Sequence, residues 1–288
     1  MDGFSIAFNE ITLVLFTTLA PAGAVGYLLM SLPVLLGRVN EDDRRRLDQY
    51  SCLPLAIAMV GLIASATHLG NPSNALYVFT GVGRSPLSTE VLCAVIFLAL
   101  AGMYWLYAFA EHPRRWLQRW LVAAVDLSIV LFVVSIAFAY HVDTIITWSL
   151  PLVPVSLMLN ALVGGPVITL LGFAAAGYCG HGPGEGRLLV AMAAVALAAN
   201  AVVYLVMGAQ LSGMANELAS VSQLVPGFVP CVVAFVLLAA TGLTVAWRSV
   251  CRGLAVRPLV VASLLVLAGI FIMRFTFYMS HLTVGLGV

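Results

Sequence analysis

The sequence contains no lysine and few charged residues of either sign. Aspartate, glutamate and arginine together account for 9% of the 288 residues, whereas hydrophobic residues account for 62%. The mean hydropathy of +1.07 is far above that of a soluble domain of this length. The formal net charge of +1 gives no indication of nucleic-acid binding, which needs a basic surface. The composition instead indicates an integral membrane protein.

The five cysteines lack the spacing of a metal site. The sequence has no CxxC motif and no run of cysteines and histidines at metal-ligand spacing, which argues against a zinc or iron–sulfur site held by this chain. We expect the cysteines to pack between helices as small apolar residues; they are Cys52, Cys93, Cys179, Cys231 and Cys251.

Long apolar runs make up most of the sequence. Runs of about 20 residues can cross the roughly 30 Å hydrocarbon core as helices, and their lack of alternation excludes strands. The first run lacks a basic start and follows Asp2 and Glu10, so we expect a spanning helix rather than a cleaved signal. The sequence predicts an all-α integral membrane protein, one domain over residues 1–288, with eight helices: Ile11–Leu36, Leu53–His68, Leu87–Ala110, Trp120–Tyr140, Val155–Tyr178, Leu188–Met207, Phe228–Trp247 and Leu259–Tyr278.

The arginines predict the orientation in the membrane. Eleven of the 13 lie in loops on one side of the predicted bundle, which the positive-inside rule assigns to the cytoplasm. Both termini are then expected outside, together with the longer loops 70–86, 141–154 and 208–227. The eleven are Arg38, Arg44, Arg45, Arg46, Arg114, Arg115, Arg119, Arg187, Arg248, Arg252 and Arg257.

The second predicted helix ends in a histidine near the outer boundary. At 1.5 Å per residue, His68 lies roughly 22 Å along the helix from Leu53. Gly70, Asn71 and Pro72 follow and are expected to stop the helix.

Glu90 lies one turn into the third predicted helix, which starts with Ser85 as N-cap and Pro86 at the first helical position. Consecutive helices joined by a compact loop usually pack together, so we expect His68 and Glu90 to share one pocket. Two alternatives stay open: the helix dipole alone favours a glutamate near a helix start, and a boundary histidine often serves as an amphipathic anchor. Ionisable groups at this depth nevertheless indicate a functional site.

A polar pocket under the outer boundary suits oxidation of a lipid-soluble hydroquinone. An imidazole or a carboxylate can accept a hydrogen bond from each phenolic hydroxyl group and then its proton. The two electrons need an acceptor, and the sequence offers no redox site of its own. We therefore expect the acceptor to belong to another protein on the same outer face.

The last predicted helix adds polar residues on one face. Arg274, Tyr278 and His281 recur at i, i+4 and i+7 and approach the outer boundary. A buried Arg274 needs a partner or an aqueous cavity, so we expect it to pair with Glu90 or to bind a quinone oxygen. The alternative is an arginine that snorkels to the lipid headgroups.

Other polar residues give less specific signals. Asn71 and Arg84 on the outer loop are further candidates for quinol binding, and Arg84 is also expected to be solvated or to bind phosphate. Asp126 belongs either to a proton path or to a hydrogen bond inside the bundle. Asn160 and Asn200 are expected to form interhelical hydrogen bonds. Aromatic residues predict the two boundaries, with Trp116, Trp120 and Trp247 at the inner one and Trp148 at the outer one.

At these residues the chain resembles the membrane anchor subunit of the dimethyl sulfoxide reductase family. Gly164-Gly165-Pro166 is similar to the fifth helix of that family, and the length, the eight helices and the outside termini agree over essentially the whole chain. The motif that carries the resemblance is His68-Leu69-Gly70, Pro72, Ser85, Leu87, Ser88 and Glu90.

The resemblance implies a menaquinol-oxidising subunit of the bacterial cytoplasmic membrane that holds no haem or metal. His68 and Glu90 match the histidine and glutamate of the family's quinol site. The family resemblance also implies two partners on the outer face: a four-cluster iron–sulfur subunit, and a catalytic subunit that carries molybdenum bis-pterin.

Two other functions compete with this interpretation. A b-type haem subunit is one, because His68, His141 and His281 all fall near the outer boundary and two of them could ligate one haem. A secondary transporter is the other, although transporters usually show repeats and polar groups at the midplane, whereas here the polar groups gather at one edge.

Overall fold

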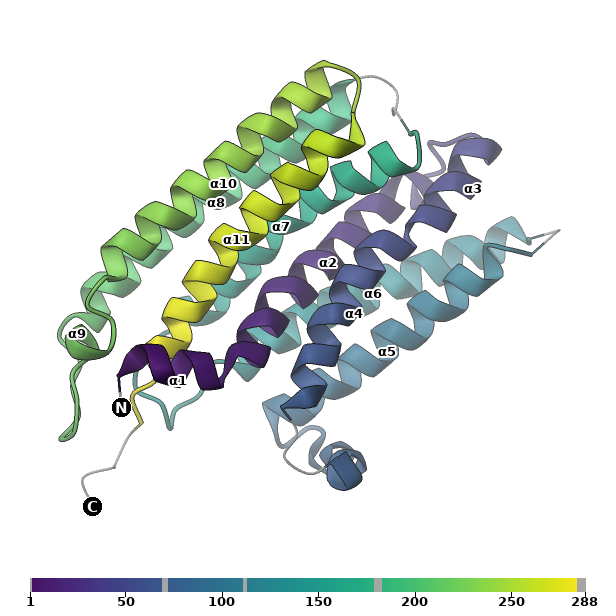
Figure 1. The fold of residues 1–288 in the computed structure, drawn as a ribbon. Coiled ribbons are helices and arrows are strands. Elements are labelled where there is room, and N and C mark those ends of the chain that lie inside the picture. Colours follow the sequence, from purple (N-terminus) through teal and green to yellow (C-terminus); the bar gives the residue numbers. More distant parts are fainter. Residues whose placement is uncertain (1, 69–71, 111–112, 179–182, 284–288) are drawn as a thin grey trace.

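The computed structural model describes every residue except 1, 69–71, 111–112, 179–182 and 284–288, and in this part the regular secondary structure is helical, joined by loops. Eight spans, each of them long and apolar enough to cross a membrane, run side by side in the described part of the chain (Figure 1). They are α2 (Ile11–Leu35), α3 and α4 together (Glu41–Tyr50 and Cys52–Thr67), α5 (Pro86–Tyr107), α6 (Arg115–Ala139), α7 (Leu152–Ala175), α8 (Pro183–Leu211), α10 (Phe228–Cys251) and α11 (Val256–Met279).

The predicted all-helical bundle is confirmed, and the differences lie at helix ends. The second span begins well before Leu53, because the polar segment Glu41–Tyr50 is itself helical. The Asn40 side chain accepts a hydrogen bond from the Asp43 N–H at 2.7 Å. Three acidic residues in the first turn also stabilise the helix, because they interact favourably with the positive end of its dipole. An amphipathic start thus precedes the apolar part of the span.

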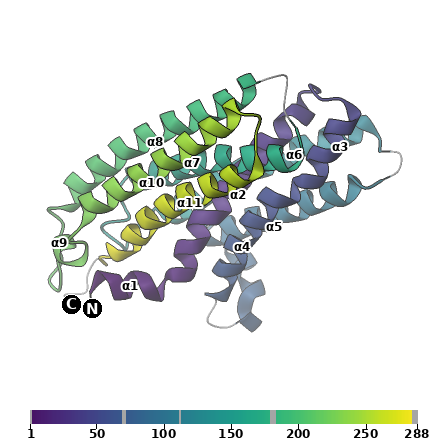
Figure 2. The same ribbon diagram turned by 45° about the horizontal axis from the view of Figure 1, so that its top comes forward.

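Two central helices organise the bundle. Both α2 and α7 are buried along most of their length; α4, α5 and α6 lie on the α2 side, and α8, α10 and α11 lie around α7 (Figures 1 and 2). The hydrophobic core therefore follows α2 and α7 along the whole span.

Glycines allow close contact between these central helices and their neighbours. A Cβ atom at Gly61 of α4 would lie 2.7 Å from the backbone nitrogen of Ala20 in α2. At Gly164 of α7, it would lie 2.8 Å from the Cβ atom of Ala22. Gly164 thus allows α7 to pack closely on α2, because only a residue without a side chain fits there.

Both described chain ends lie at the same end of the bundle, which we call the terminal end. Helix α1 (Gly3–Asn9) packs against α11, with Phe4 and Phe275 ring centroids 5.3 Å apart. The short helix α9 (Val221–Leu224) and the 3₁₀ helix η1 (Pro72–Gly81) lie at the terminal end too, whereas α3 lies at the opposite end with most arginines (Figure 1). That the terminal end faces outward stays a prediction.

Two expectations about surface residues are wrong. Trp148 is only 9% exposed and stacks on Phe277 at 4.6 Å, so it belongs to the core rather than to an outer aromatic belt. Cys52 and Cys251 are exposed near the arginine-rich end instead of packed between helices, and Cys179 lies outside the described residues.

The glycine contacts predict how the bundle responds to added bulk. Gly61→Ala should lower the free energy of unfolding by about 1–3 kcal/mol, because the new methyl group pushes against the α2 backbone. Gly102→Ala on α5 is the matched control, since a Cβ atom there meets nothing within 4 Å. Thermal unfolding of the detergent-solubilised protein, followed by circular dichroism, measures both. Equal stability of the two variants would contradict the tight α2–α4 contact.

Candidate functional site

His68 lies at the terminal end, where it caps α4. The helix ends because its last turn tightens: the His68 N–H donates to the Ser65 carbonyl at 3.1 Å. The imidazole Nε2 lies 3.4 Å from Oε2 of Glu10, which stands between α1 and α2. His68 and Glu10 are both partly exposed, so this pair connects the bundle to water.

Glu90 lies in the second turn of α5 and is only 3% exposed. The predicted start of this helix is confirmed, with Pro86 in the first turn and the Ser85 side chain accepting a hydrogen bond from the Ser88 N–H at 3.4 Å. Glu90 Oε2 has no hydrogen-bond partner among the described residues. Because a buried polar oxygen without a partner costs free energy, this oxygen is available for a bound ligand or water.

Arg274 of α11 is 1% exposed and lies in the same region. Its Nε donates to Thr17 Oγ1 of α2 at 2.9 Å, and its guanidinium lies 4.2 Å from the Phe277 ring centroid. No carboxylate of the described residues forms an ion pair with it, so the expected pairing with Glu90 is wrong, as is a snorkelling arginine. The faces of the surrounding rings stabilise the cation instead.

Tyr140, at the end of α6, links Glu90 to α11. Arg274 lies 5.6 Å from the ring centroids of both Tyr140 and Tyr278, and these rings meet edge to face at 6.0 Å. Burial raises the pKa of Tyr140 well above its ordinary value; Tyr278 and Glu90 add to this shift, and Arg274 opposes it. Tyr140, Arg274 and Tyr278 therefore interact as one group, and Glu90 is close enough to act on Tyr140. We call these four residues the Glu90–Arg274 cluster.

The Glu90–Arg274 cluster contains both donors and an acceptor that are open. Arg274 Nη2, like Glu90 Oε2, is buried without a hydrogen-bond partner in the described structure. The Tyr278 hydroxyl group lies near Tyr140, Thr17 and Arg274 but forms no hydrogen bond of good geometry with them. A ligand with a hydroxyl group at one end and an oxygen acceptor at the other would satisfy these atoms. The head group of a quinol or quinone carries oxygens of both kinds, one at each end of its ring.

The histidines near the cluster have other neighbours. His281 stacks on Trp148 at 5.1 Å; burial lowers the pKa of His281, and the Glu10 carboxylate opposes this shift. His68 faces Glu10, and His141 Nδ1 is buried without a partner among the described residues. His68 and His281 are thus engaged by Glu10 and Trp148, which does not favour a haem between them. The described residues contain no group of three or more histidine, cysteine, aspartate or glutamate side chains that could hold a metal ion.

The loop candidate Arg84 lies outside the cluster. Arg84 is exposed, and its side chain forms no hydrogen bond or ion pair with the described residues, which agrees with a solvated arginine. Asn71 lies outside the described residues.

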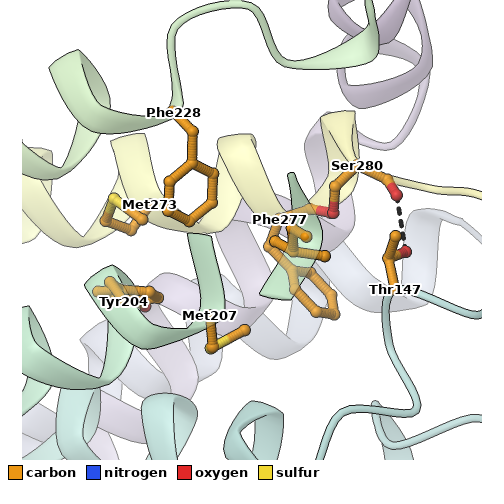
Figure 3. A pocket seen from close by; sticks show the side chains of 8 residues that line it. Thr147, Tyr204, Met207, Phe228, Met273, Phe277 and Ser280 are labelled. Atoms are coloured by element: carbon orange, nitrogen blue, oxygen red, sulfur yellow. Dashed lines mark hydrogen bonds between the residues drawn. The ribbon is translucent and has the colours of Figure 1, made fainter. Parts of the chain in front are cut away.

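A small cavity lies beside Phe277, whose ring also contacts Arg274. Figure 3 shows it between Tyr204, Met207, Phe228 and Met273, beside the 2.7 Å hydrogen bond from Thr147 Oγ1 to the Ser280 carbonyl. Its volume of about 10 Å³ is at the lower limit for one water molecule. It is therefore too small for a quinol ring.

Asp126 belongs to a different polar group, farther toward the arginine-rich end. It accepts a hydrogen bond from Ser31 Oγ at 2.6 Å. This agrees with the second of its two predicted roles, a hydrogen bond inside the bundle. At 1.5 Å per residue along α5 and α6, its depth differs from that of Glu90 by roughly 15 Å. The stacked rings of Phe97 and Phe132 lie at depths between them.

Asn160 and Asn200 form the predicted interhelical bonds between α7 and α8. Asn160 Nδ2 donates to the Tyr204 hydroxyl group at 2.7 Å, and Asn200 Nδ2 donates to Asn160 Oδ1 at 2.8 Å.

Three residues of the site were not found from the sequence. Thr17 and Tyr140 give no signal, because a threonine in an apolar run and a tyrosine at a helix end are ordinary. Glu10 could have been found: it is an acidic residue just before the first span, at the same boundary as His68.

Comparison with known proteins identifies the family. A model of the DMSO reductase anchor subunit (DmsC) family matches residues 4–279. The C subunit of the anaerobic dimethyl sulfoxide reductase of Escherichia coli K12 is 30% identical over 286 residues, covering 98% of both proteins. The YnfH subunit of an E. coli anaerobic dimethyl sulfoxide reductase is 30% identical over 285 residues, again covering 98% of both. The corresponding C subunit of Haemophilus influenzae is 30% identical over 285 residues, covering 97% of both.

A match over nearly the whole length, together with eight apolar helices that make it a multi-pass protein of the bacterial inner membrane, shows that the chain belongs to the DMSO reductase anchor subunit family.

Proposed function

We propose that this membrane anchor oxidises menaquinol and passes the electrons to the other subunits of a molybdenum-dependent reductase of the dimethyl sulfoxide reductase type. The observation that carries this proposal is the Glu90–Arg274 cluster, in which one buried acceptor and two buried donors have no partner among the described residues. The names of the relatives support the assembly, since each is a subunit of an anaerobic dimethyl sulfoxide reductase.

The open atoms suggest how the head group binds. Glu90 accepts a hydrogen bond from one quinol hydroxyl group and then its proton, while Arg274 and Tyr278 donate to the oxygen across the ring. The guanidinium also stabilises negative charge that develops on that oxygen as its proton passes to the imidazole of His68. The apolar tail of the quinol extends between helices into the lipid.

The protons leave through the His68–Glu10 pair. This pair lies at the terminal end and is partly exposed, so it can take a proton from the site and release it to water. Glu10 orients the imidazole through its 3.4 Å contact with Nε2. In this proposal Glu90 and His68 transfer protons, and Glu10 positions His68.

The electrons leave through a partner on the same face. Oxidation of one menaquinol releases two electrons and two protons, and no metal-binding group is found among the described residues. The acceptor is a four-cluster iron–sulfur subunit docked on the terminal end, which faces outward. That subunit supplies a catalytic subunit with molybdenum bis-pterin.

Removal of either proton acceptor tests the site. Glu90→Gln or His68→Asn should lower menaquinol oxidation by the assembled complex by about 10²–10⁴-fold, because each removes a proton acceptor. Activity with an artificial soluble electron donor should be unchanged, since that donor bypasses the anchor; this is the control for assembly. Normal menaquinol oxidation by both variants would show that the site lies elsewhere.

Replacement of Glu10 should have a smaller effect on menaquinol oxidation than replacement of Glu90 or His68. Glu10→Gln should lower kcat for menaquinol about tenfold, because a contact to a charged partner is lost while His68 remains. Asp2→Asn is the control: it removes an acidic charge at the same end, where Asp2 contacts the Ser5 N–H and caps α1. Comparable losses in both variants would point to general surface charge rather than to orientation of His68.

The position of the site also predicts the energetics of turnover. Protons and electrons leave on the same face, and the Phe97–Phe132 pair lies between the depths of Glu90 and Asp126, so quinol oxidation should build no membrane potential. A potential-sensitive dye in proteoliposomes measures this, calibrated with potassium diffusion potentials. A steady potential that Asp126→Asn abolishes would instead place a proton path through Asp126.

A further inference from the structure

The arginine-rich end carries a second feature, far from the Glu90–Arg274 cluster. A groove of about 650 Å³ lies between the end of α2 and the start of α6. Its lining combines two cationic side chains with four apolar ones: Arg115, Arg119, Leu35, Trp116, Trp120 and Ala123.

Two turns of α6 provide the polar and aromatic parts of this groove. Arg115 and Arg119 are four residues apart, as are Trp116 and Trp120, so each pair lies along one side of the helix. The tryptophans are 60% and 69% exposed, as is typical of rings at the level of lipid headgroups. The groove therefore spans the boundary between headgroups and acyl chains.

The two arginines differ in how their charge is compensated. Arg115 forms an ion pair with Glu41, which also lies 3.8 Å from Arg44. Arg119 has no acidic partner in the described parts of the protein. Its guanidinium lies against Gly37, which has a φ of +66° and where an added Cβ atom would be 3.0 Å from Nη2. Arg119 is thus an exposed arginine beside the turn after α2, and no acidic side chain of the described residues compensates its charge.

The start of α6 strengthens the attraction for an anion. This 25-residue helix has no acidic residue in its first turn, and no side chain of the described residues caps it. Its first N–H groups and the positive end of its dipole favour a negative charge near Arg115.

We propose that this groove binds an anionic phospholipid of the arginine-rich leaflet. The phosphate contacts Arg119 and the start of α6, and an acyl chain lies along Leu35, Trp120 and Ala123. In a bilayer, lipid fills any groove at this depth, and an uncompensated guanidinium selects a negative headgroup from the lipids available. Free phosphate would leave the apolar part of the groove unfilled. The site is independent of quinol oxidation.

Quenching of tryptophan fluorescence by brominated lipids tests this proposal. The full-length protein is reconstituted in phosphatidylcholine vesicles that contain either brominated phosphatidylglycerol or brominated phosphatidylcholine. The groove signal is the difference in fluorescence quenching between the unaltered protein and its Trp116→Leu/Trp120→Leu variant. That variant retains the other tryptophans, whose quenching is common to both proteins.

We expect the groove signal to show a preference for phosphatidylglycerol, and Arg119→Gln should reduce this preference about fivefold, as the loss of one arginine at the membrane surface implies. Arg252→Gln is the matched control, because Arg252 is exposed at the same end, after α10; it should retain the preference. Circular dichroism confirms that each variant is folded.

Equal quenching by the two brominated lipids would overturn the proposal. So would an unchanged preference in Arg119→Gln, or an equal loss in Arg252→Gln, since the latter would show only the general surface charge of this end.

Discussion

The candidate site depends on a buried cation that has no carboxylate partner among the described residues, the guanidinium of Arg274. Removing a guanidinium from water costs several kcal/mol unless the protein replaces its hydration. Thr17 of α2 and the rings of Tyr140, Phe277 and Tyr278 supply that replacement. These side chains come from α2, from α11 and from the end of α6, so the cation contacts three elements, and its Nη2 still has no hydrogen-bond partner among the described residues.

The close approach of the helices makes this arrangement possible. Gly61 of α4 and Gly164 of α7 bring their helices into near-backbone contact with α2, so that α2 lies in the centre of the bundle with Thr17 buried. In lipid there is no hydrophobic driving force between apolar helices, and packing of small residues replaces it. The glycines therefore contribute to the site although none of them touches it.

The two ends of the bundle have different polar chemistry. The terminal end has the partly exposed His68–Glu10 pair and buried groups whose hydrogen-bonding atoms are open. At the arginine-rich end, carboxylates engage arginines or hydroxyl groups, as in the Arg115–Glu41 pair and the Tyr104–Asp48 hydrogen bond of 2.5 Å. Arg44 and Gln118 there also have buried atoms without a partner among the described residues. The aromatic layer of Phe97 and Phe132 lies between these regions, which suits redox chemistry at one face and lipid contact at the other.

The sequence by itself determined the membrane class, the eight spans and the candidate residues His68, Glu90 and Arg274, because hydropathy and charge are local properties of a polypeptide. Only the tertiary structure decided their partners. In the structure His68 contacts Glu10, and Arg274 donates a hydrogen bond to Thr17. Trp148 lies in the core instead of in the expected aromatic belt. The physical reason is that contacts between helices depend on their rotation and depth, which a uniformly apolar span does not encode, since most of its faces are equally hydrophobic.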